Sequence, residues 1–450
     1  MAKVIKITKG LDIAMKGKAE KHVNIANRSQ TYAVKPTDFT GLTPKVHAKA
    51  GTVVKAGDTL FYDKYRPEVV FTAPVSGKLS AVNRGFRRKI LEFVIEPDKE
   101  IDYAEFTKAD PESLSPEEIK ENILKSGCWP YIRQRPFNII ADTKKAPRDI
   151  FITTFNSAPL APDYELTVKE DFEAFQTGVN ALKKLTEGKV YLGLKANSPS
   201  NIFANTAGAE KYEFDGPHPA GNVGVQINKV KPVNINEIVW TLSAPDVVSI
   251  GRLFMEGKYD ASRIVAVTGS EIEKPAYFKI IQGAEIKSFT EKPSGNESDI
   301  RYISGNVLSG EKVNRSGYLG FYDYQLTAIP EGNEGEVFGW AMPGLDKFSV
   351  SRAFFTWLNP KKERVITTKL HGMKRPFIQT GEIEKVFPMD IYPMQLLKAV
   401  KYQDLDQLEQ LGIYEVAEED FALCEVVNSS KIEMQKMIRE GFEFMIKELG

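Results

Sequence analysis

Short apolar runs separated by glycine turns fill the region between residues 45 and 96. Val53 and Val54 lead into a turn at 55–58, and two further apolar runs flank a polar tip at 63–67. Runs of this length, punctuated by glycine and proline, are typical of strands in a small β-domain. The pattern therefore predicts a barrel-like β-sandwich.

Longer apolar segments that alternate between strand and helix periods begin near residue 148. The strand candidates are 149–154, 190–194 and 238–242, and amphipathic helices are predicted at 172–185 and 246–256. Strands that alternate with helices are typical of parallel sheets with helical crossovers. We expect an α/β layer with parallel strands in this part of the chain.

Two further segments with different sequence patterns follow the α/β layer. A strand at 263–267 opens a compact α+β unit that extends to about residue 330, and the tail from residue 390 is helical. The last helix carries an apolar stripe formed by Ile438, Phe442, Met445, Ile446 and Leu449. Such a stripe must be buried, against the rest of the chain or against a partner.

Composition narrows the possible functions of this 450-residue chain. Its 60 Lys and Arg residues balance 60 Asp and Glu residues, which argues against a nucleic-acid-binding protein, since those normally carry a basic excess. The two cysteines, Cys128 and Cys424, exclude a disulfide framework and a cysteine-ligated iron–sulfur cluster, which needs about four thiolates. The four histidines show no paired spacing of metal ligands.

No segment approaches the roughly 20 apolar residues that span a bilayer. The N-terminus carries lysines throughout and lacks the apolar core of a secretion signal. We therefore expect a cytoplasmic protein that takes part in any membrane process through a protein partner.

The densest group of chemically capable side chains lies in GCWPYIRQRPF, residues 127–137. Aromatic rings beside guanidinium groups suit a planar redox ligand or an anion. Trp129, Arg133, Arg135 and Phe137 are therefore candidate ligand-binding residues. The same residues equally suit a packed helix end whose arginines pair with acids, and the sequence leaves both possibilities open.

The loop at 216–224 holds a further candidate. His218 lies between two prolines that fix the backbone, so its ring could bind a quinone head-group. A structural role is favoured because no base partner for it is identifiable. The stretch Gly221–Gly224 lacks the third glycine of the dinucleotide-binding fingerprint and follows no strand, which favours a turn between domains.

Three other features have simple interpretations. Cys424 lies in an apolar run, so we expect it to be buried. The basic run 84–89 is interpreted as a solvated turn, with docking of an acidic partner as the alternative. Asp63-Lys64 at a predicted hairpin tip is similar to the modified tip of lipoyl domains, although without the full motif we expect Lys64 to be unmodified.

A distinctive set of segments runs nearly end to end through the chain: 3–13, 55–64, 73–89, 127–137, 216–233, 246–254, 338–349 and 418–427. In their sequence and their order, these segments resemble the A-subunit family of bacterial sodium-translocating NADH:quinone oxidoreductases. A more distant resemblance is to the C subunit of the Rnf complex and to the flavin subunit of respiratory complex I.

The resemblance implies a multidomain α/β and α+β protein with four domains. They are a biotinyl/lipoyl-like β-sandwich at 1–102, a Rossmann-like α/β domain at 103–254, a β-grasp domain of the soluble-ligand-binding type at 255–380 and a helical domain at 381–450.

It also implies a peripheral subunit on the cytoplasmic side of the bacterial inner membrane. The complex would oxidise NADH, reduce quinone and export sodium. The expected partners are the membrane subunits and the NADH-oxidising subunit, and the expected ligand is quinone. The alternatives are a purely structural assembly scaffold and, less favoured, a lipoyl-type carrier modified on Lys64.

Two departures from the complex I relative bear on cofactors. That relative holds its flavin on a glycine-rich loop, whereas the corresponding stretch here, 127–137, has one glycine followed by bulky Trp129, Pro130 and Tyr131. The relative's cluster cysteines are replaced by Cys424 alone. We therefore expect this chain to bind neither flavin nor an iron–sulfur cluster, and these groups to reside in partner subunits.

Overall fold

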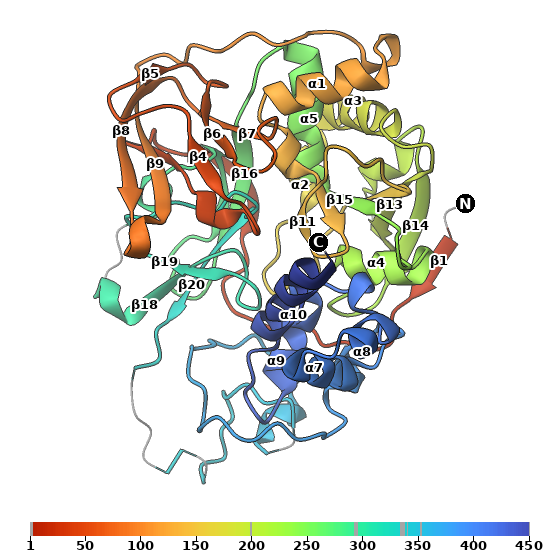
Figure 1. Cartoon of the computed structure of the whole chain (residues 1–450). Coiled ribbons are helices and arrows are strands. Elements are labelled where there is room, and N and C mark those ends of the chain that lie inside the picture. Colours follow the sequence, from red (N-terminus) through yellow and green to blue (C-terminus); the bar gives the residue numbers. More distant parts are fainter. Residues whose placement is uncertain are drawn as a thin grey trace.

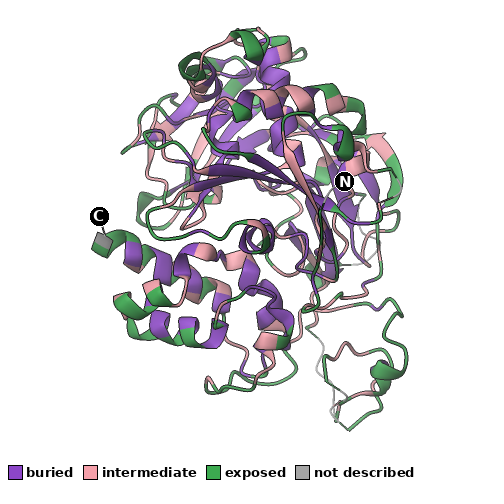
Figure 2. Ribbon diagram, turned by 90° about the vertical axis from the view of Figure 1, so that its right-hand side faces the viewer, coloured by how far each residue is buried: buried purple, intermediate pink, exposed green. Residues whose placement is uncertain are grey.

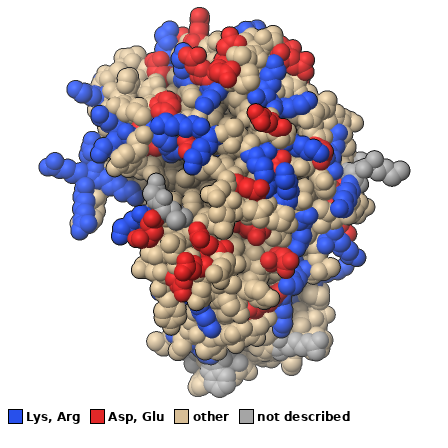
Figure 3. Space-filling model, turned by 45° about the vertical axis from the view of Figure 1, so that its right-hand side comes forward, with Lys and Arg blue, Asp and Glu red and all other residues tan. Residues whose placement is uncertain are grey.

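The computed structural model describes residues 3–198, 200–291, 296–333, 338–339, 341–351 and 353–449. Two small antiparallel sheets, a seven-stranded α/β sheet, a six-stranded sheet and a group of C-terminal helices make up the described part of the chain (Figure 1). Acidic and basic side chains are interspersed over the face shown in Figure 3, in keeping with the zero net charge.

The two small sheets form the predicted β-sandwich. One has the order β3 (Tyr32–Val34), β9 (Ile90–Pro97), β8 (Gly77–Arg84), β5 (Val53–Val54), and the other has the order β4 (Pro44–Val46), β6 (Thr59–Asp63), β7 (Val70–Thr72). Between them Phe61 stacks on Phe71 and on Phe93, with ring centroids 4.6 and 4.7 Å apart. These stacked rings are the core of the sandwich.

The α/β layer is a seven-stranded sheet, and its parallel character confirms the prediction. Its order is β1 (Lys3–Lys6), β14 (Glu210–Asp215), β13 (Val190–Lys195), β12 (Asp149–Thr153), β15 (Val239–Ser243), β10 (Arg133–Arg135), β11 (Ile139–Ile140). The first five strands are parallel, and β10 and β11 are antiparallel additions at the edge.

Helices cover both faces of this sheet. On one face α3 (Phe172–Lys183) packs against α5 (Ala244–Glu256), near α1 (Pro116–Lys125) and α2 (Tyr164–Val168). On the other face α4 (Val223–Val230) covers Phe151 and Tyr191. The first turn of α1 carries the capping box that Ser115 and Glu118 form, which satisfies backbone N–H groups at the start of the helix.

The second large sheet is mixed. Its order is β19 (Glu311–Val313), β18 (Ile300–Ser304), β20 (Gln325–Pro330), β16 (Ser262–Thr268), β17 (Ala276–Ile281), β2 (Glu20–Ile25). Strand β2 pairs with β17, and β1 pairs with β14 of the α/β sheet. Residues 3–6 and 20–25 therefore belong to these two sheets, although the resemblance assigns residues 1–102 to one domain.

Five helices make up the C-terminal part: α6 (Ile383–Val386), α7 (Pro393–Tyr402), α8 (Leu405–Gln410), α9 (Ala422–Val427) and α10 (Met434–Leu449). In the stripe of α10, Ile438, Phe442 and Met445 are fully buried in one core with Ile7 and Phe214 of the body. Ile446 is 40% exposed, and the Leu449 side chain lies outside the described residues. Figure 2 shows the buried faces of these helices turned inward, so the chain itself covers most of the stripe.

Within the described residues, no helix combines the length and the apolar character that crossing a membrane requires.

Candidate functional site

The strand order of the α/β sheet creates a switch point between β12 and β15. From β12 the chain adds β13 and then β14 on one side, and it returns to add β15 on the other side of β12. In open α/β sheets, ligands bind in the crevice that such a reversal leaves at the carboxyl ends of the strands. A cavity of about 410 Å³ lies there, within the usual size of a small-molecule site.

Three parts of the chain line this switch-point cavity. The strand ends contribute Thr153, Thr241 and Ser243, and the start of α4 contributes Asn222. Further side chains that line it are Arg133, Asn138, Phe155, Tyr164 and Asp246 from the α/β layer, Tyr322, Tyr324 and Gln325 from the six-stranded sheet and its loops, and Glu418, Glu419 and Gln435 from the C-terminal part.

Arg133 supplies the positive charge of the cavity wall. Its guanidinium carbon lies 4.9 Å from the centre of the Tyr322 ring, and the Tyr322 hydroxyl donates to the carbonyl oxygen of Pro130 at 2.7 Å. The side chain is only partly buried, so it remains accessible from the cavity. Asp246 faces the same space and accepts hydrogen bonds from Ser243 Oγ at 2.6 Å and from the Tyr324 hydroxyl at 2.7 Å.

Three of the lining residues each keep a buried polar atom without a hydrogen-bond partner among the described residues. These atoms are Asn138 Oδ1, Thr241 Oγ1 and Gln325 Oε1. Buried polar groups are normally hydrogen-bonded to protein or to ordered water. The lining therefore contains one hydroxyl and two amide oxygens whose hydrogen-bonding capacity is unused within the described residues.

The other candidates from the 127–137 segment lie outside the cavity. Trp129 is fully buried, donates from Nε1 to the carbonyl oxygen of Ala141 at 2.9 Å and packs edge-on against Trp240. Arg135 is fully buried, and its Nη2 lies 3.1 Å from Glu419 Oε1. Phe137 packs between Tyr414 and Phe442 of the C-terminal part. Of these four residues, the structure brings only Arg133 to the switch point.

His218 also lies apart from the cavity. Its ring is buried, with Nδ1 3.0 Å from Ser157 Oγ, and its backbone N–H donates to Asp12 Oδ1 at 2.9 Å. Burial lowers the pKa of His218 to about 4, so the ring is neutral near pH 7. A second cavity, of about 590 Å³, adjoins the switch-point cavity across the loop that contains Asn156, and His218 does not line either of the two.

No sequence motif indicated the contact between the N-terminus of α4 and Asp420. A Cβ on Gly224 would lie 2.4 Å from Oδ2 of Asp420, so only glycine lets this carboxyl approach the helix. Asp420 also accepts a hydrogen bond from the N–H of Ala417, and burial raises its pKa while nearby Arg135 lowers it. The Asp420 carboxyl therefore lies against the first turn of α4, where its Oδ1 has no hydrogen-bond partner among the described residues.

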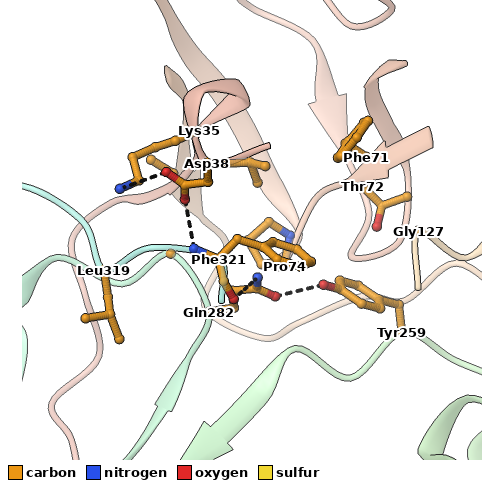
Figure 4. Close-up of a pocket in the computed structure, with 13 residues that line it drawn as sticks. Lys35, Asp38, Phe71, Thr72, Pro74, Gly127, Tyr259, Gln282, Leu319 and Phe321 are labelled. Carbon is orange, nitrogen blue, oxygen red and sulfur yellow. Dashed lines mark hydrogen bonds and ion pairs between the residues drawn. The ribbon is translucent and has the colours of Figure 1, made fainter. Parts of the chain in front are cut away.

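A smaller cavity, shown in Figure 4, lies where the sandwich meets the six-stranded sheet. Asp38 Oδ2 accepts from the N–H of Phe321 at 2.8 Å, and its Oδ1 lies 3.2 Å from Lys35 Nζ. Burial raises the pKa of Asp38 to about 6. The space measures about 20 Å³, which is enough for a water molecule and too little for an organic ligand.

Comparison with known proteins identifies the family. Three family models match: the NqrA N-terminal barrel-sandwich hybrid domain over residues 5–98, the NqrA second alpha/beta domain over 114–259 and the NQRA C-terminal domain over 264–315. The A subunit of the Na(+)-translocating NADH-quinone reductase from Neisseria meningitidis (strain Z2491) is 37% identical, over 99% of this chain and 100% of the relative. The chain belongs to this NqrA family.

Other members of the NqrA family are equally similar. The Pasteurella multocida protein is 36% identical over 99% of this chain and all of its own length, and the Yersinia pestis (strain Angola) protein is 37% identical over 97% and 98%. Among solved structures, a NAD+-reducing [NiFe]-hydrogenase matches 48% of this chain and 47% of its own, with 13% identity and a TM-score of 0.33. That likeness is too weak to bear on this chain.

Membership in the NqrA family confirms the recognition made from the sequence motifs, and the barrel-sandwich domain confirms the N-terminal β-sandwich. Lys64 is exposed at its hairpin tip, 5.3 Å from the Tyr65 ring, and the expectation that it is unmodified stays a prediction. Both cysteines are buried as free thiols, and burial raises the pKa of Cys128 to about 12. The described residues contain no group of three metal-ligating side chains.

Proposed function

We propose that this chain is the peripheral, cytoplasmic-side NqrA component of a sodium-pumping NADH:quinone oxidoreductase, and that it contributes to quinone interaction and complex assembly. In this proposal the α/β layer is Rossmann-like, the six-stranded unit is a β-grasp domain, and the partners are the membrane subunits and the NADH-oxidising subunit. The observation that carries the quinone role is Arg133 beside Tyr322 in the wall of the switch-point cavity.

The polar atoms of the cavity match the two states of a quinone head-group. A quinone has carbonyl oxygens that accept hydrogen bonds, and Arg133 and the Thr241 hydroxyl would donate them. A quinol has hydroxyl groups that donate, and the free amide oxygens of Asn138 and Gln325 would accept. The rings of Tyr322 and Tyr164 provide apolar faces for the head-group.

The same proposal assigns the flavins and the iron–sulfur cluster to partner subunits. Trp129 and Tyr131 are packed in the core, in the stretch that by resemblance corresponds to the glycine-rich loop of the complex I relative. Two buried cysteines on different parts of the chain support the same assignment.

Quinone titration of the full-length chain, alone and within the complex, tests the proposed role. Removing the charge-assisted hydrogen bond with Arg133→Ala should cost about 1.5–3 kcal/mol, or roughly 10- to 100-fold in affinity, with the melting temperature unchanged. Thr241→Val, which keeps the side-chain shape, should weaken binding without unfolding the protein.

Arg135→Ala serves as the matched arginine control. Arg135 is buried beside Glu419 and does not line the cavity, so its loss should lower the melting temperature and leave the quinone affinity unchanged. If Arg133→Ala binds quinone like the wild type, the cavity is not a quinone site and the assembly scaffold becomes the better interpretation.

A further inference from the structure

Exposed apolar side chains gather in residues 338–378, here named the apolar–basic segment. Of the 21 large apolar side chains that are exposed in the described part of the chain, eleven lie in this segment. They include Phe338, Leu345, Phe355, Leu358 and Met373, which are 53–84% exposed. So many exposed apolar groups in one stretch of chain exceed the scattered single positions that a protein surface normally carries.

The fold itself holds this segment in place. The buried Arg364 donates to the carbonyl oxygens of Thr356 and Asn359, and its backbone pairs with residues 14–16 near the N-terminus. Further along, the N–H of Arg375 donates to the carbonyl oxygen of Ser430 at 3.1 Å. The segment lies at the lower edge of the molecule (Figures 1 and 2), where its Ile366 packs against Ile303 and Ile329 of the six-stranded sheet.

The segment also concentrates positive charge. It contains eight Lys and Arg residues against two Asp and Glu residues, a net charge of +6 in a chain whose total is zero. Lys362 pairs with Asp346 and Lys374 with Glu433. Lys361 and Arg375 are exposed and have no ion pair among the described residues.

We propose that the apolar–basic segment docks directly on the anionic lipid headgroups of the bilayer that holds the complex. This inference rests on the proposed function, because it takes the chain to be a peripheral component of a membrane complex. Aromatic and aliphatic side chains mixed with Lys and Arg are the composition of membrane–water interfaces. The positive charge would be attracted by anionic headgroups, and the apolar side chains would enter the boundary beneath them.

The form of the segment favours lipid over a protein partner. Its described residues contain no α-helix and no strand, only the short 3₁₀ turn at Phe355–Leu358 and an isolated bridge at Arg364. Protein recognition by strand addition or by a helix in a groove needs a regular element that this surface lacks. A bilayer surface needs no matching shape.

Sedimentation of the full-length chain with vesicles tests the proposal. The wild type should bind vesicles of phosphatidylcholine mixed with phosphatidylglycerol, bind those of phosphatidylcholine alone much more weakly, and lose binding at high salt. Lys361→Gln with Arg375→Gln should weaken binding about 25-fold, at roughly five-fold for each charge. Phe355→Ser with Leu358→Ser should weaken it at least about ten-fold.

The matched control is the tip of the β8–β9 hairpin, where Phe86 is 84% exposed beside Arg87 and Arg88. Arg87→Gln with Arg88→Gln removes the same charge from a similar aromatic site and should leave vesicle binding unchanged. All these side chains are exposed or partly exposed, so each variant should melt like the wild type.

Two results would overturn the proposal: a wild type that does not bind anionic vesicles, and a hairpin-tip variant that loses binding in place of the segment variants. If the wild type does not bind vesicles and the segment variants also fail to join the complex, the partner of the segment is another protein of the complex. The quinone titration with Arg133→Ala is independent of vesicles. A negative vesicle result therefore does not affect the proposed quinone role, which the titration tests separately.

Discussion

His218 shows how a single residue can look functional in the sequence and act structurally in the fold. Two prolines hold it, as the sequence indicates, but its partners are Ser157 and Asp12, which lie 61 and 206 positions away in the sequence. Its neutral ring is buried, and protonating the ring there costs free energy. The free energy of unfolding should therefore depend on pH.

Between pH 6.5 and 4, the unfolded chain protonates His218 and the folded chain does not, because burial lowers the folded pKa from 6.5 to about 4. The contribution of the neutral ring to the free energy of unfolding is therefore fully present above about pH 6.5 and is lost as the pH falls toward 4. His218→Asn keeps a hydrogen-bonding group near Ser157 and removes the titration. Over this window, wild type should lose about 3 kcal/mol more unfolding free energy than the variant.

Urea unfolding of both proteins at several pH values measures this difference. Asp38, whose pKa is raised to about 6, acts with the opposite sign but is present in both proteins, so its effect cancels. Parallel pH profiles for the two proteins would mean that His218 is protonated, or solvated, in the fold.

The 127–137 segment marks the limit of prediction from sequence at the residue scale. Arg133 and Arg135 are two positions apart on one strand and look alike in the sequence. The structure gives Arg133 a place beside Tyr322 in the cavity, whereas Arg135 is buried against Glu419. Both partners come from parts of the chain about 190 to 280 residues further on, and local pattern contains no signal for them.

At the scale of elements, the predicted strands and helices are correct where the sequence pattern of a segment shows which of its side chains are buried. Strands β12, β13 and β15 are buried apolar runs and α3 and α5 have clear helical periods, so they were found. Strands β1 and β2 are short and largely exposed, and they exist because they pair with strands more than 200 residues away. The lining of the switch-point cavity is not indicated by any motif for the same reason, since it depends on strand order.

The contact between α3 and α5 depends on two glycines, and this gives a prediction for that pair of helices. A Cβ on Gly251 would lie 1.7 Å from the carbonyl oxygen of Ala174, and one on Gly178 would lie 2.3 Å from that of Val247. Gly251→Ala must push the helices apart, so it should lower the unfolding free energy by about 3 kcal/mol despite the better helix propensity of alanine.

Ser249→Ala, on the same helix and of similar size, is the control and should change the unfolding free energy by no more than about 0.5 kcal/mol. Chemical denaturation of the three proteins provides the comparison. A Gly251→Ala protein as stable as wild type would show that the helices are not in backbone contact.

At the scale of the whole molecule, the C-terminal helices are part of the body rather than an appendage. Phe442 is fully buried, with its ring 5.8 Å from that of Phe137, and one core joins α10 to Ile7, Phe214 and Val225. Glu419 from the same part pairs with Arg135, and Glu418 lines the switch-point cavity. The sequence predicted the apolar stripe of α10, but not that α7 and α9 cover most of it, with Phe137 of the body against Phe442.

This shared core predicts that the C-terminal helices and the α/β layer unfold together. Phe442→Ala should lower the unfolding free energy by about 3–5 kcal/mol, and the loss should shift one cooperative transition. Ile446→Ala, one turn further along α10 and 40% exposed, should cost about 1 kcal/mol or less. Calorimetry, followed in parallel by tryptophan fluorescence from the buried Trp129 and Trp240, distinguishes the possibilities. If Phe442→Ala instead produced an early transition that leaves this fluorescence unchanged, the helices would be an independent domain whose docking adds little to the stability of the body.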